Sequence, residues 1–292
     1  MADFGTFLGV CYADNQLFYS INSPLQSQHL QRIGSIDFNF DVADAIVKGH
    51  PKSFDAVRNA LNKLREQYEC REARILLPAT EECWSIMPRM AHDQSDEREA
   101  SLKVLMHGVE RENIETTWYG LSSKDYKMLL VRNNSTMEGF RKLFNGFASV
   151  DYVAEPEIGN DWQKHTQING SYLTLNCHHN HIVVSSYLLG KLRGATYILY
   201  ESLIDLPYLW KFHATHLNWL RGIHEQVYVY GQHAQEVLEI LTGSIDDSGE
   251  IILMNTLENM QVRADEETYG FRLESAFPAI MLSLNISEKE LT

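Results

Sequence analysis

Two apolar segments around a polar turn open the chain and predict a pair of antiparallel strands. Residues 7–12 and 17–21 are mostly apolar, and the polar run 13–16 separates the two segments. Short apolar runs indicate strands, and a short polar run between two of them indicates a tight turn. We therefore predict a β-hairpin, followed by a third strand over 32–40.

Helical and strand patterns then alternate up to residue 154. Apolar positions at helical spacing predict helices over 54–68, 96–107 and 137–147, with Ser53 and Ser95 as caps of the first two. Short apolar or alternating runs predict strands over 73–78, 83–87, 114–121, 126–131 and 150–154. A three-strand meander followed by helices and strands is thus the predicted plan of the first half.

The opening pattern recurs after Gly170. Strands are predicted over 172–177 and 182–187 around a polar turn, with a third strand through 198–200. A helix over 205–220, a strand over 226–230, a helix over 234–241, a strand over 251–254 and a helix over 277–284 complete the pattern. The two halves share this plan without a convincing sequence repeat.

The segment between the halves, from Pro156 to Gly170, is polar and carries two glycines and a proline. Such composition is typical of a connection between domains. We therefore expect an N-terminal lobe over 1–156, a linker over 157–170 and a C-terminal lobe over 171–292.

Aromatic residues crowd the helix predicted over 205–220. Helical spacing leaves Trp210 as the residue most exposed to solvent and assigns to the inward face Leu206, Leu209, Phe212 or His213, and Leu217. Tyrosine and tryptophan are enriched at protein interfaces, so this segment is a candidate binding surface, although most of it is expected to be core.

Composition indicates a globular protein of about two domains. Of the 292 residues, 44% are hydrophobic, 11% aromatic and 22% charged, and the formal net charge is −14. An acidic chain without a run of Lys or Arg repels a phosphate backbone, so we expect no nucleic-acid partner.

The distribution of apolar residues and cysteines bears on the compartment. No apolar segment approaches the ~20 residues of a membrane span, and no export signal is recognised, so we expect no membrane insertion. The four cysteines, Cys11, Cys70, Cys83 and Cys177, are widely spaced without a C-x-x-C pair. Neither a disulfide framework nor a structural zinc site is indicated, and a reducing, cytoplasmic location is predicted.

Several segments of the second half resemble a known family. They are Gly190-Lys191-Leu192, 197–202, Asp205 with Tyr208, and 227–231, and the spacing from Gly190 to Gly231 is their most specific feature. With the duplicated plan, they resemble an uncharacterised Bacteroidetes family with an actin-like ATPase fold. The first half, including Leu76-Leu77-Pro78, is also similar to the actin-like assembly protein of type IV pili.

The resemblance implies an α/β, two-lobed actin-like (RNase H-like) fold. Each lobe is expected to be a mixed sheet that a three-strand meander opens and helices flank. Active members carry an Asp-x-Gly-Thr/Ser turn in the first hairpin, because a carboxylate holds the hydration shell of Mg²⁺ while bare backbone N–H groups approach phosphate. Here Cys11 stands in place of that Asp, Ala13 in place of the Gly, and Asp14 is displaced into the turn.

The other two nucleotide motifs that the resemblance implies are also altered. In the second phosphate loop, Asn176 and the histidines from His178 onward replace an Asp-x-Gly sequence. The adenosine motif keeps one of its paired glycines, Gly231. We therefore interpret these residues as degenerate loops and expect that ordinary Mg·ATP binding is lost, leaving no cofactor.

A histidine-rich turn over 177–181 is the other candidate for chemistry. His179 and His181 are two apart and share one strand face, which makes them weak candidates for a transition-metal site. The alternative, which we favour, is a polar turn with exposed imidazoles, since a strong site needs further ligands. No phosphate-binding loop, nucleophile elbow or H-E-x-x-H pair is present, so no catalytic residue is predicted.

The sequence favours a non-catalytic actin-like module that binds a protein partner, in the manner of a scaffold. The alternative is a divergent ATPase or kinase-like phosphotransferase that uses the cleft between the lobes. Neither the partner nor the oligomeric state follows from the sequence.

Overall fold

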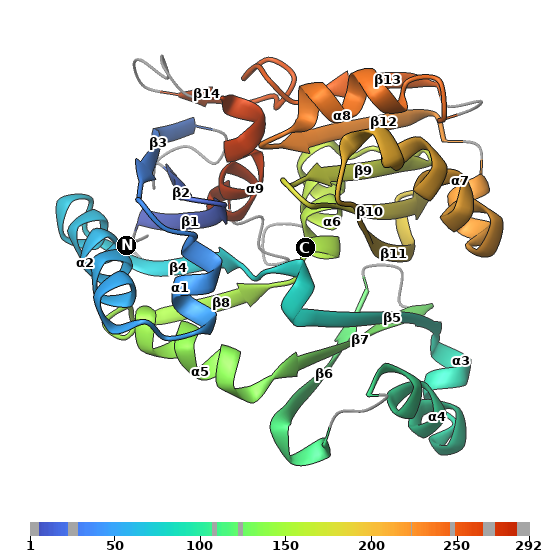
Figure 1. Cartoon of the computed structure of the whole chain (residues 1–292), viewed down its shortest axis with the longest axis horizontal. Helices are drawn as coiled ribbons and strands as arrows, with labels where there is room; N and C mark the ends of the chain where they lie inside the picture. The colour runs from blue at the N-terminus through green and yellow to red at the C-terminus, as the bar shows by residue number, and fades with distance from the viewer. Residues whose placement is uncertain are drawn as a thin grey trace.

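Two mixed sheets with the same strand order lie side by side in the computed structural model (Figure 1). The structure describes residues 6–22, 29–106, 110–121, 125–222, 224–245, 249–264 and 272–284. The first sheet consists of β3 (His29–Asp37), β2 (Gln16–Asn22), β1 (Thr6–Ala13), β4 (Cys70–Leu76) and β8 (Ser149–Val153), with β14 (Arg263–Ala264) beside β3. The second consists of β11 (Lys191–Leu199), β10 (His181–Leu188), β9 (Tyr172–Cys177), β12 (Gln226–Gly231) and β13 (Glu250–Leu253).

Strand directions repeat as well as strand order. In the first sheet the meander β1, β2, β3 is antiparallel, and β1, β4 and β8 are parallel. In the second sheet the meander β9, β10, β11 is antiparallel, and β9, β12 and β13 are parallel. Both predicted hairpins and both meanders are confirmed.

A third, antiparallel sheet is inserted between β4 and β8. It has the order β5 (Glu82–Pro88), β7 (Tyr126–Asn133), β6 (Ile114–Gly120) and carries α3 (Arg89–His92) and α4 (Ser95–Leu105). A buried ion pair holds it: Arg132 Nε lies 2.6 Å from Glu82 Oε1. Because Arg132 Nη2 also donates to the carbonyl of Tyr152 in β8, at 2.9 Å, the same side chain ties the insertion to the first sheet.

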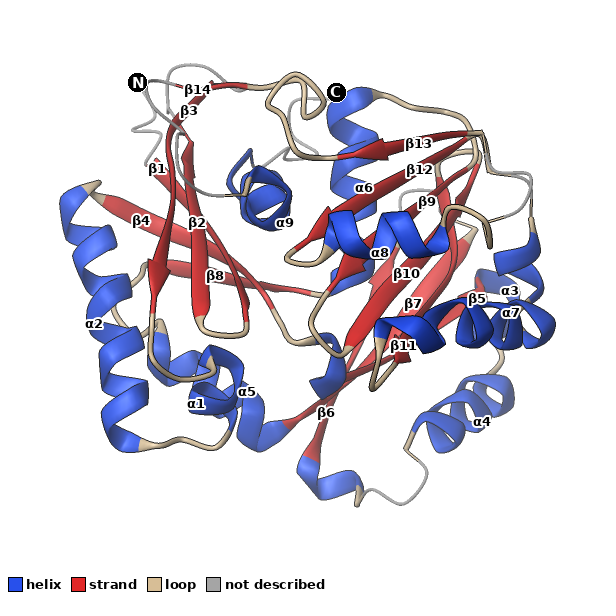
Figure 2. Ribbon diagram, turned by 45° about the horizontal axis from the view of Figure 1, so that its top comes forward, coloured by secondary structure: helices blue, strands red, loops and turns tan. Residues whose placement is uncertain are grey.

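Helices cover the outer face of each large sheet. On the first sheet, α1 (Val42–Val47), α2 (Pro51–Gln67) and α5 (Asn134–Leu143) bury a core that includes Leu8, Val57, Leu61 and Phe140. On the second, α7 (Leu206–His216) and α8 (Ala234–Leu241) bury a core that includes Leu175, Trp210 and Val237. Figure 2 shows α1 and α2 on one side of the first sheet and a further helix, α9 (Leu273–Leu284), on the other.

The inner faces share one core between the halves. Helix α6 (Glu155–Thr166) packs against β10 and β11 of the second sheet, whereas α9 packs against β1, β2 and β4 of the first. The two helices touch through Trp162 and Phe277, whose ring centroids are 5.6 Å apart. Each half is therefore completed by a helix that enters from the other half.

This arrangement differs from the predicted linker. Residues 157–170 were expected to connect two lobes, but α6 fills most of that segment and most of its first eight residues are buried. The physical reason is visible locally: Pro156 stands in the first turn, and Glu157 Oε1 accepts a hydrogen bond from the N–H of Ala154 at 3.0 Å. Ile158 and Trp162, one turn apart, then face the core.

The end of the described chain also departs from a simple division in two. Beyond Val262, β14 pairs with β3 and α9 covers the first sheet, although 171–292 was predicted as one lobe. The lobe boundaries remain a prediction about folding units, whereas the chain path crosses between the sheets twice.

Three local predictions are wrong. Helix α2 begins at Pro51 after the N-cap His50, so Ser53 is not its cap, because proline is favoured in the first turn. Helix α4 begins at Ser95 itself, after Gln94. Trp210 is 4% exposed, whereas Tyr208 and Phe212 are 71% and 50% exposed. Both faces of α7 are apolar, so helical spacing alone could not select the buried one.

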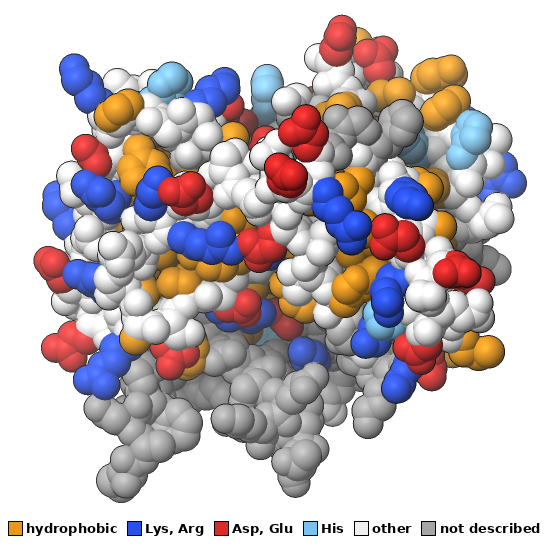
Figure 3. Space-filling model, turned by 90° about the horizontal axis from the view of Figure 1, so that it is seen from below, with side chains coloured by type: hydrophobic (Ala, Val, Ile, Leu, Met, Phe, Trp, Pro, Cys, Tyr) orange, Lys and Arg blue, Asp and Glu red, His pale blue; other side chains and the backbone are white. Residues whose placement is uncertain are grey.

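The surface gives two further observations. The described part of the chain contains no helix with the length and apolar character of a membrane span. On the face seen from below (Figure 3), Lys and Arg side chains are interspersed with Asp and Glu side chains rather than gathered in one block.

Candidate functional site

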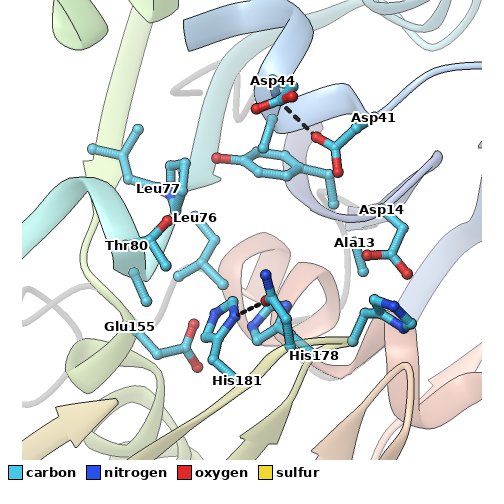
Figure 4. Close-up of a pocket in the computed structure, with 16 residues that line it drawn as sticks. Ala13, Asp14, Asp41, Asp44, Leu76, Leu77, Thr80, Glu155, His178 and His181 are labelled. Atoms are coloured by element: carbon cyan, nitrogen blue, oxygen red, sulfur yellow. Dashed lines mark hydrogen bonds between the residues drawn. The ribbon is translucent and has the colours of Figure 1, made fainter. Parts of the chain in front are cut away.

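A cavity of about 250 Å³ lies where the turns of the two hairpins meet the chain that follows β4. Its walls come from both halves: the end of β1, the start of α1, the segment after β4, the start of α6 and the turn after β9. The lining residues are Tyr12, Ala13, Asp14, Asp41, Ala43, Asp44, Leu76, Leu77, Pro78, Ala79, Thr80, Glu155, His178, His179, Asn180 and His181. Figure 4 shows Asp41 and Asp44 on the side of the cavity opposite Glu155, His178 and His181.

The first turn brings two predicted site residues to the cavity. Ala13 ends β1 opposite Gln16, and Asp14 adopts the left-handed conformation (φ 49°), which aspartate tolerates better than most residues. Burial raises the pKa of Asp14, and the nearby imidazoles of His179 and His233 partly offset that rise.

Cys11 lies on the opposite side of β1 from Tyr12 and does not line the cavity. Its side chain is 3% exposed, and its Sγ donates to the carbonyl of Ser275 in α9 at 3.6 Å. Burial raises the pKa of the Cys11 thiol well above its ordinary value, so the group is uncharged. Cys11 is a packing residue beneath α9.

The second turn presents uncharged histidines. The N–H of His178 donates to the carbonyl of His181 at 2.9 Å, and the two rings stack with centroids 4.3 Å apart and 8° between their planes. Burial lowers the pKa of His181 to about 4 and that of His178 well below its ordinary value. Both rings are therefore neutral at pH 7 and contribute no positive charge to the cavity.

The two candidate metal ligands do not share a site. His181 Nδ1 lies 2.7 Å from Asn180 Oδ1 and its ring stacks on His178, whereas His179 is exposed and lies beside His233, with ring centroids 5.5 Å apart. Alternation along one strand placed these histidines on a common face in the prediction, but His179 belongs to the turn and only His181 begins β10.

Gly231 and Asn176 lie behind the second turn rather than in the lining of the cavity. Gly231 ends β12 opposite Cys177, with φ 106°. A Cβ atom there would lie 2.4 Å from the Cys177 carbonyl oxygen and 2.5 Å from its nitrogen, so only glycine fits. Asn176 is buried in β9 and hydrogen-bonds to Glu155.

Glu155 is the cavity residue that sequence reasoning missed. It is the first residue of α6, is 3% exposed and accepts a hydrogen bond from the hydroxyl of Tyr230 at 3.1 Å. Burial raises the pKa of Glu155 to about 7, although hydrogen bonds from Asn176 and Tyr230 oppose the rise. An acidic residue directly before Pro156 is a helix-start signal that could have located it.

The charged groups in the described lining are acidic, and one of them, Asp44, pairs with Lys48, which is not a lining residue. Four carboxyl groups line it, those of Asp14, Asp41, Asp44 and Glu155. Within the described parts of the chain, its lining includes neither Lys nor Arg. The structure thus brings Ala13, Asp14 and His178 together and sets Cys11, Asn176 and Gly231 outside the lining.

Comparison with known proteins bears on the fold. No protein-family model and no curated protein matches the sequence. A Bacteroides thetaiotaomicron protein with an actin-like ATPase fold and unknown function is 16% identical, with a TM-score of 0.53, covering 86% of this chain and 94% of that chain. The PilM–PilN type IV pilus biogenesis complex contains a chain 12% identical, with a TM-score of 0.69, covering 95% of this chain and 97% of that chain. Together with the duplicated sheets, these similarities show that the chain has the two-lobed actin-like fold.

Proposed function

We propose that this protein is a non-catalytic actin-like module that binds another protein, and that the cavity between its halves does not bind Mg·ATP. The charge of that cavity is the observation that carries the proposal. Four carboxyl groups face it, although a pKa of about 7 leaves Glu155 partly protonated at neutral pH. Its two half-buried histidines are neutral, and its described lining includes no Lys or Arg. A triphosphate brought there meets like charge in a partly desolvated space, which costs several kcal/mol.

The shape of the cavity supports the same proposal. Ala13 and His178 carry side chains where phosphate would require bare backbone N–H groups. The volume of about 250 Å³ is also below the roughly 300–1,000 Å³ of ordinary ligand pockets.

Binding of a protein partner is supported by an exposed apolar stripe, Ile204, Tyr208 and Phe212, which are spaced four residues apart. Ile204 lies in the 3-10 turn directly before α7, and the other two lie in α7. The three side chains are 84%, 71% and 50% exposed. Exposed apolar groups of this size in one line are typical of interaction surfaces. The similarity to a chain from a complex in pilus biogenesis supports an assembly role, and four free cysteines support a cytoplasmic location.

A divergent ATPase or phosphotransferase is the second candidate, and Glu155 favours it. A buried carboxyl group whose pKa is about 7, at the edge of a cavity, has the properties of a general base. This candidate requires that phosphate enter despite the acidic lining.

Calorimetric titration with Mg·ATP separates the two candidates. The scaffold proposal predicts neither heat of binding nor a change in melting temperature at millimolar nucleotide. A ligand present at 100 times its dissociation constant stabilises the folded state by about 2.7 kcal/mol, so a micromolar site would be obvious. Binding at micromolar concentration would overturn the proposal.

Cross-linking and affinity capture test the partner-binding half of the proposal. We expect that a specific partner is recovered with the wild-type chain and is lost with the variant Y208S/F212S. The matched control is M90S/V104S, which removes two other exposed apolar side chains, 81% and 76% exposed, from α3 and α4. Equal recovery with both double variants would exclude the stripe as the binding surface.

A further inference from the structure

Three side chains that can bind a metal converge at the mouth of the cavity. They are Asp14 from the turn between β1 and β2, His179 from the turn after β9, and His233 from the residue directly before α8. One ligand atom of each lies within 4.8 Å of the other two. Asp14 comes from the first half of the molecule and both histidines from the second.

The backbone places the two histidines together. Gly231 pairs with Cys177, and the N–H of His233 reaches the Cys177 carbonyl at 3.5 Å, so the end of β12 lies directly against the end of β9. The residues two beyond each of these strand ends are His179 and His233, and their rings lie 5.5 Å apart. Because only glycine fits at 231, the close approach that brings the imidazoles together is built into the strand pairing.

Two imidazoles and one carboxylate form a ligand set suited to a transition metal. Zn²⁺ binds His nitrogen and Asp oxygen at about 2.0–2.2 Å, commonly through three protein ligands with a fourth position open to solvent. Tetrahedral ligands at that bond length stand about 3.3 Å apart, so the ligand atoms need to approach one another by at most about 1.5 Å. Rotation of the exposed His179 side chain can supply this movement. Mg²⁺ and Ca²⁺ prefer sets of oxygen ligands only.

We propose that Asp14, His179 and His233 bind one divalent transition metal of the Zn²⁺ class. The metal joins the first hairpin turn to two loops of the second half and thus ties the halves together across the cavity mouth. The site is distinct from the predicted pair His179 and His181, and it does not depend on whether the cavity binds nucleotide.

The test is calorimetric titration of the full chain, without a histidine tag and stripped of metal, with Zn²⁺. We expect one site per chain, a higher melting temperature with metal, and no binding of Mg²⁺. The variants D14N and H233A should weaken the affinity by more than the roughly 10–100-fold that loss of an outer hydrogen-bonding partner costs. The variant H181A and the exposed control H50A should bind as the wild-type chain does.

Absorption of bound Co²⁺ supplies a second measurement that reports the coordination itself. Visible d–d bands of a tetrahedral site should appear in the wild-type chain and in H181A and should be lost in H233A. Melting temperatures of the metal-free variants show whether each is folded. Absence of Zn²⁺ binding by the wild-type chain, or loss of binding in H181A with retention in H233A, overturns the proposal. An Mg·ATP result leaves it unaffected.

Discussion

The two halves build the same sheet but differ in the connection that leaves its fourth strand. In the first half, β5, β7 and β6 with α3 and α4 are inserted between β4 and β8, whereas in the second half α8 is the described element between β12 and β13. The insertion has its own small core and is fastened by Arg132, which pairs with Glu82 and donates to Tyr152. The insertion also packs into the core shared between the halves, through Leu121, Met128 and Leu130. The connection after the fourth strand thus accepts a large insertion that a buried ion pair and the shared core hold in place.

The halves also differ in how a helix approaches the inner face of each sheet. In each half a glycine permits this close approach. In the first half that glycine is on the strand: a Cβ at Gly9 would lie 2.1 Å from the carbonyl oxygen of Ala279 in α9. In the second half it is on the helix: a Cβ at Gly159 of α6 would lie 2.2 Å from the hydroxyl of Tyr187. The close contact is common to both halves, but the residue that permits it is not, which is one reason why no sequence repeat is visible.

Removal of Arg132 should have the largest effect of the predictions. The substitution R132L leaves Glu82, which is 2% exposed, without its cationic partner, although the indole N–H of Trp84 still donates to it. Breaking a buried pair costs about 3–5 kcal/mol. Urea unfolding measures the loss.

The double variant E82M/R132L should recover most of the stability lost in R132L, because apolar residues can replace a buried pair at little cost. The control K142A removes an exposed pair with Glu138 and should cost less than about 1 kcal/mol. A small loss in R132L would show that other contacts fasten the insertion.

Substitution of Gly9 and Gly159 should have the next largest effect on stability. It tests the difference between the two helix–sheet contacts. G9A should destabilise the protein by about 3 kcal/mol, since its Cβ meets backbone atoms of α9, which cannot move without displacing the helix. G159A should cost about 1–2 kcal/mol, because its Cβ meets the end of the Tyr187 side chain, which can shift. Melting temperatures of both variants check the order. Equal losses, or a larger loss in G159A, would show that the two contacts are equally rigid.

Local patterns were enough to predict the repeated part of this fold. Two short apolar runs around a polar turn, over 7–12 and 17–21, marked the first hairpin, and the same signal marked the second. These strands are apolar on both faces because helices cover the outer face of each sheet and the shared core covers the inner face. The resemblance supplied the pairing of the two halves. Local patterns did not predict which strands are neighbours in each sheet, because that order is set by tertiary contacts.

The site was harder to predict because its residues meet only after folding. Glu155 lay in a segment that composition assigned to a linker, and His233 carried no signal that it would approach His179. Cys11 matched a motif position in sequence, but the alternation along β1 turns it toward α9. Trp210 was misplaced because α7 is apolar on both faces. Each miss comes from a tertiary contact that overrides local spacing.

The carboxyl group of Glu155, which lies between the halves, should have the smallest effect on stability of these predictions, and that effect should depend on pH. Its pKa is about 7 in the folded protein, above the ordinary 4.5, so its contribution to stability is complete below pH 4.5 and is lost as the pH rises through 7. Between pH 5.5 and 8 the wild-type chain should lose about 2 kcal/mol relative to E155Q, which keeps an oxygen for the Tyr230 hydroxyl. Urea unfolding at both pH values measures the difference, and E201Q, on an exposed loop, is the matched control. A constant difference between E155Q and the wild-type chain at both pH values would show that the carboxyl group stays charged when buried, and would remove the main observation in favour of a general base at this cavity.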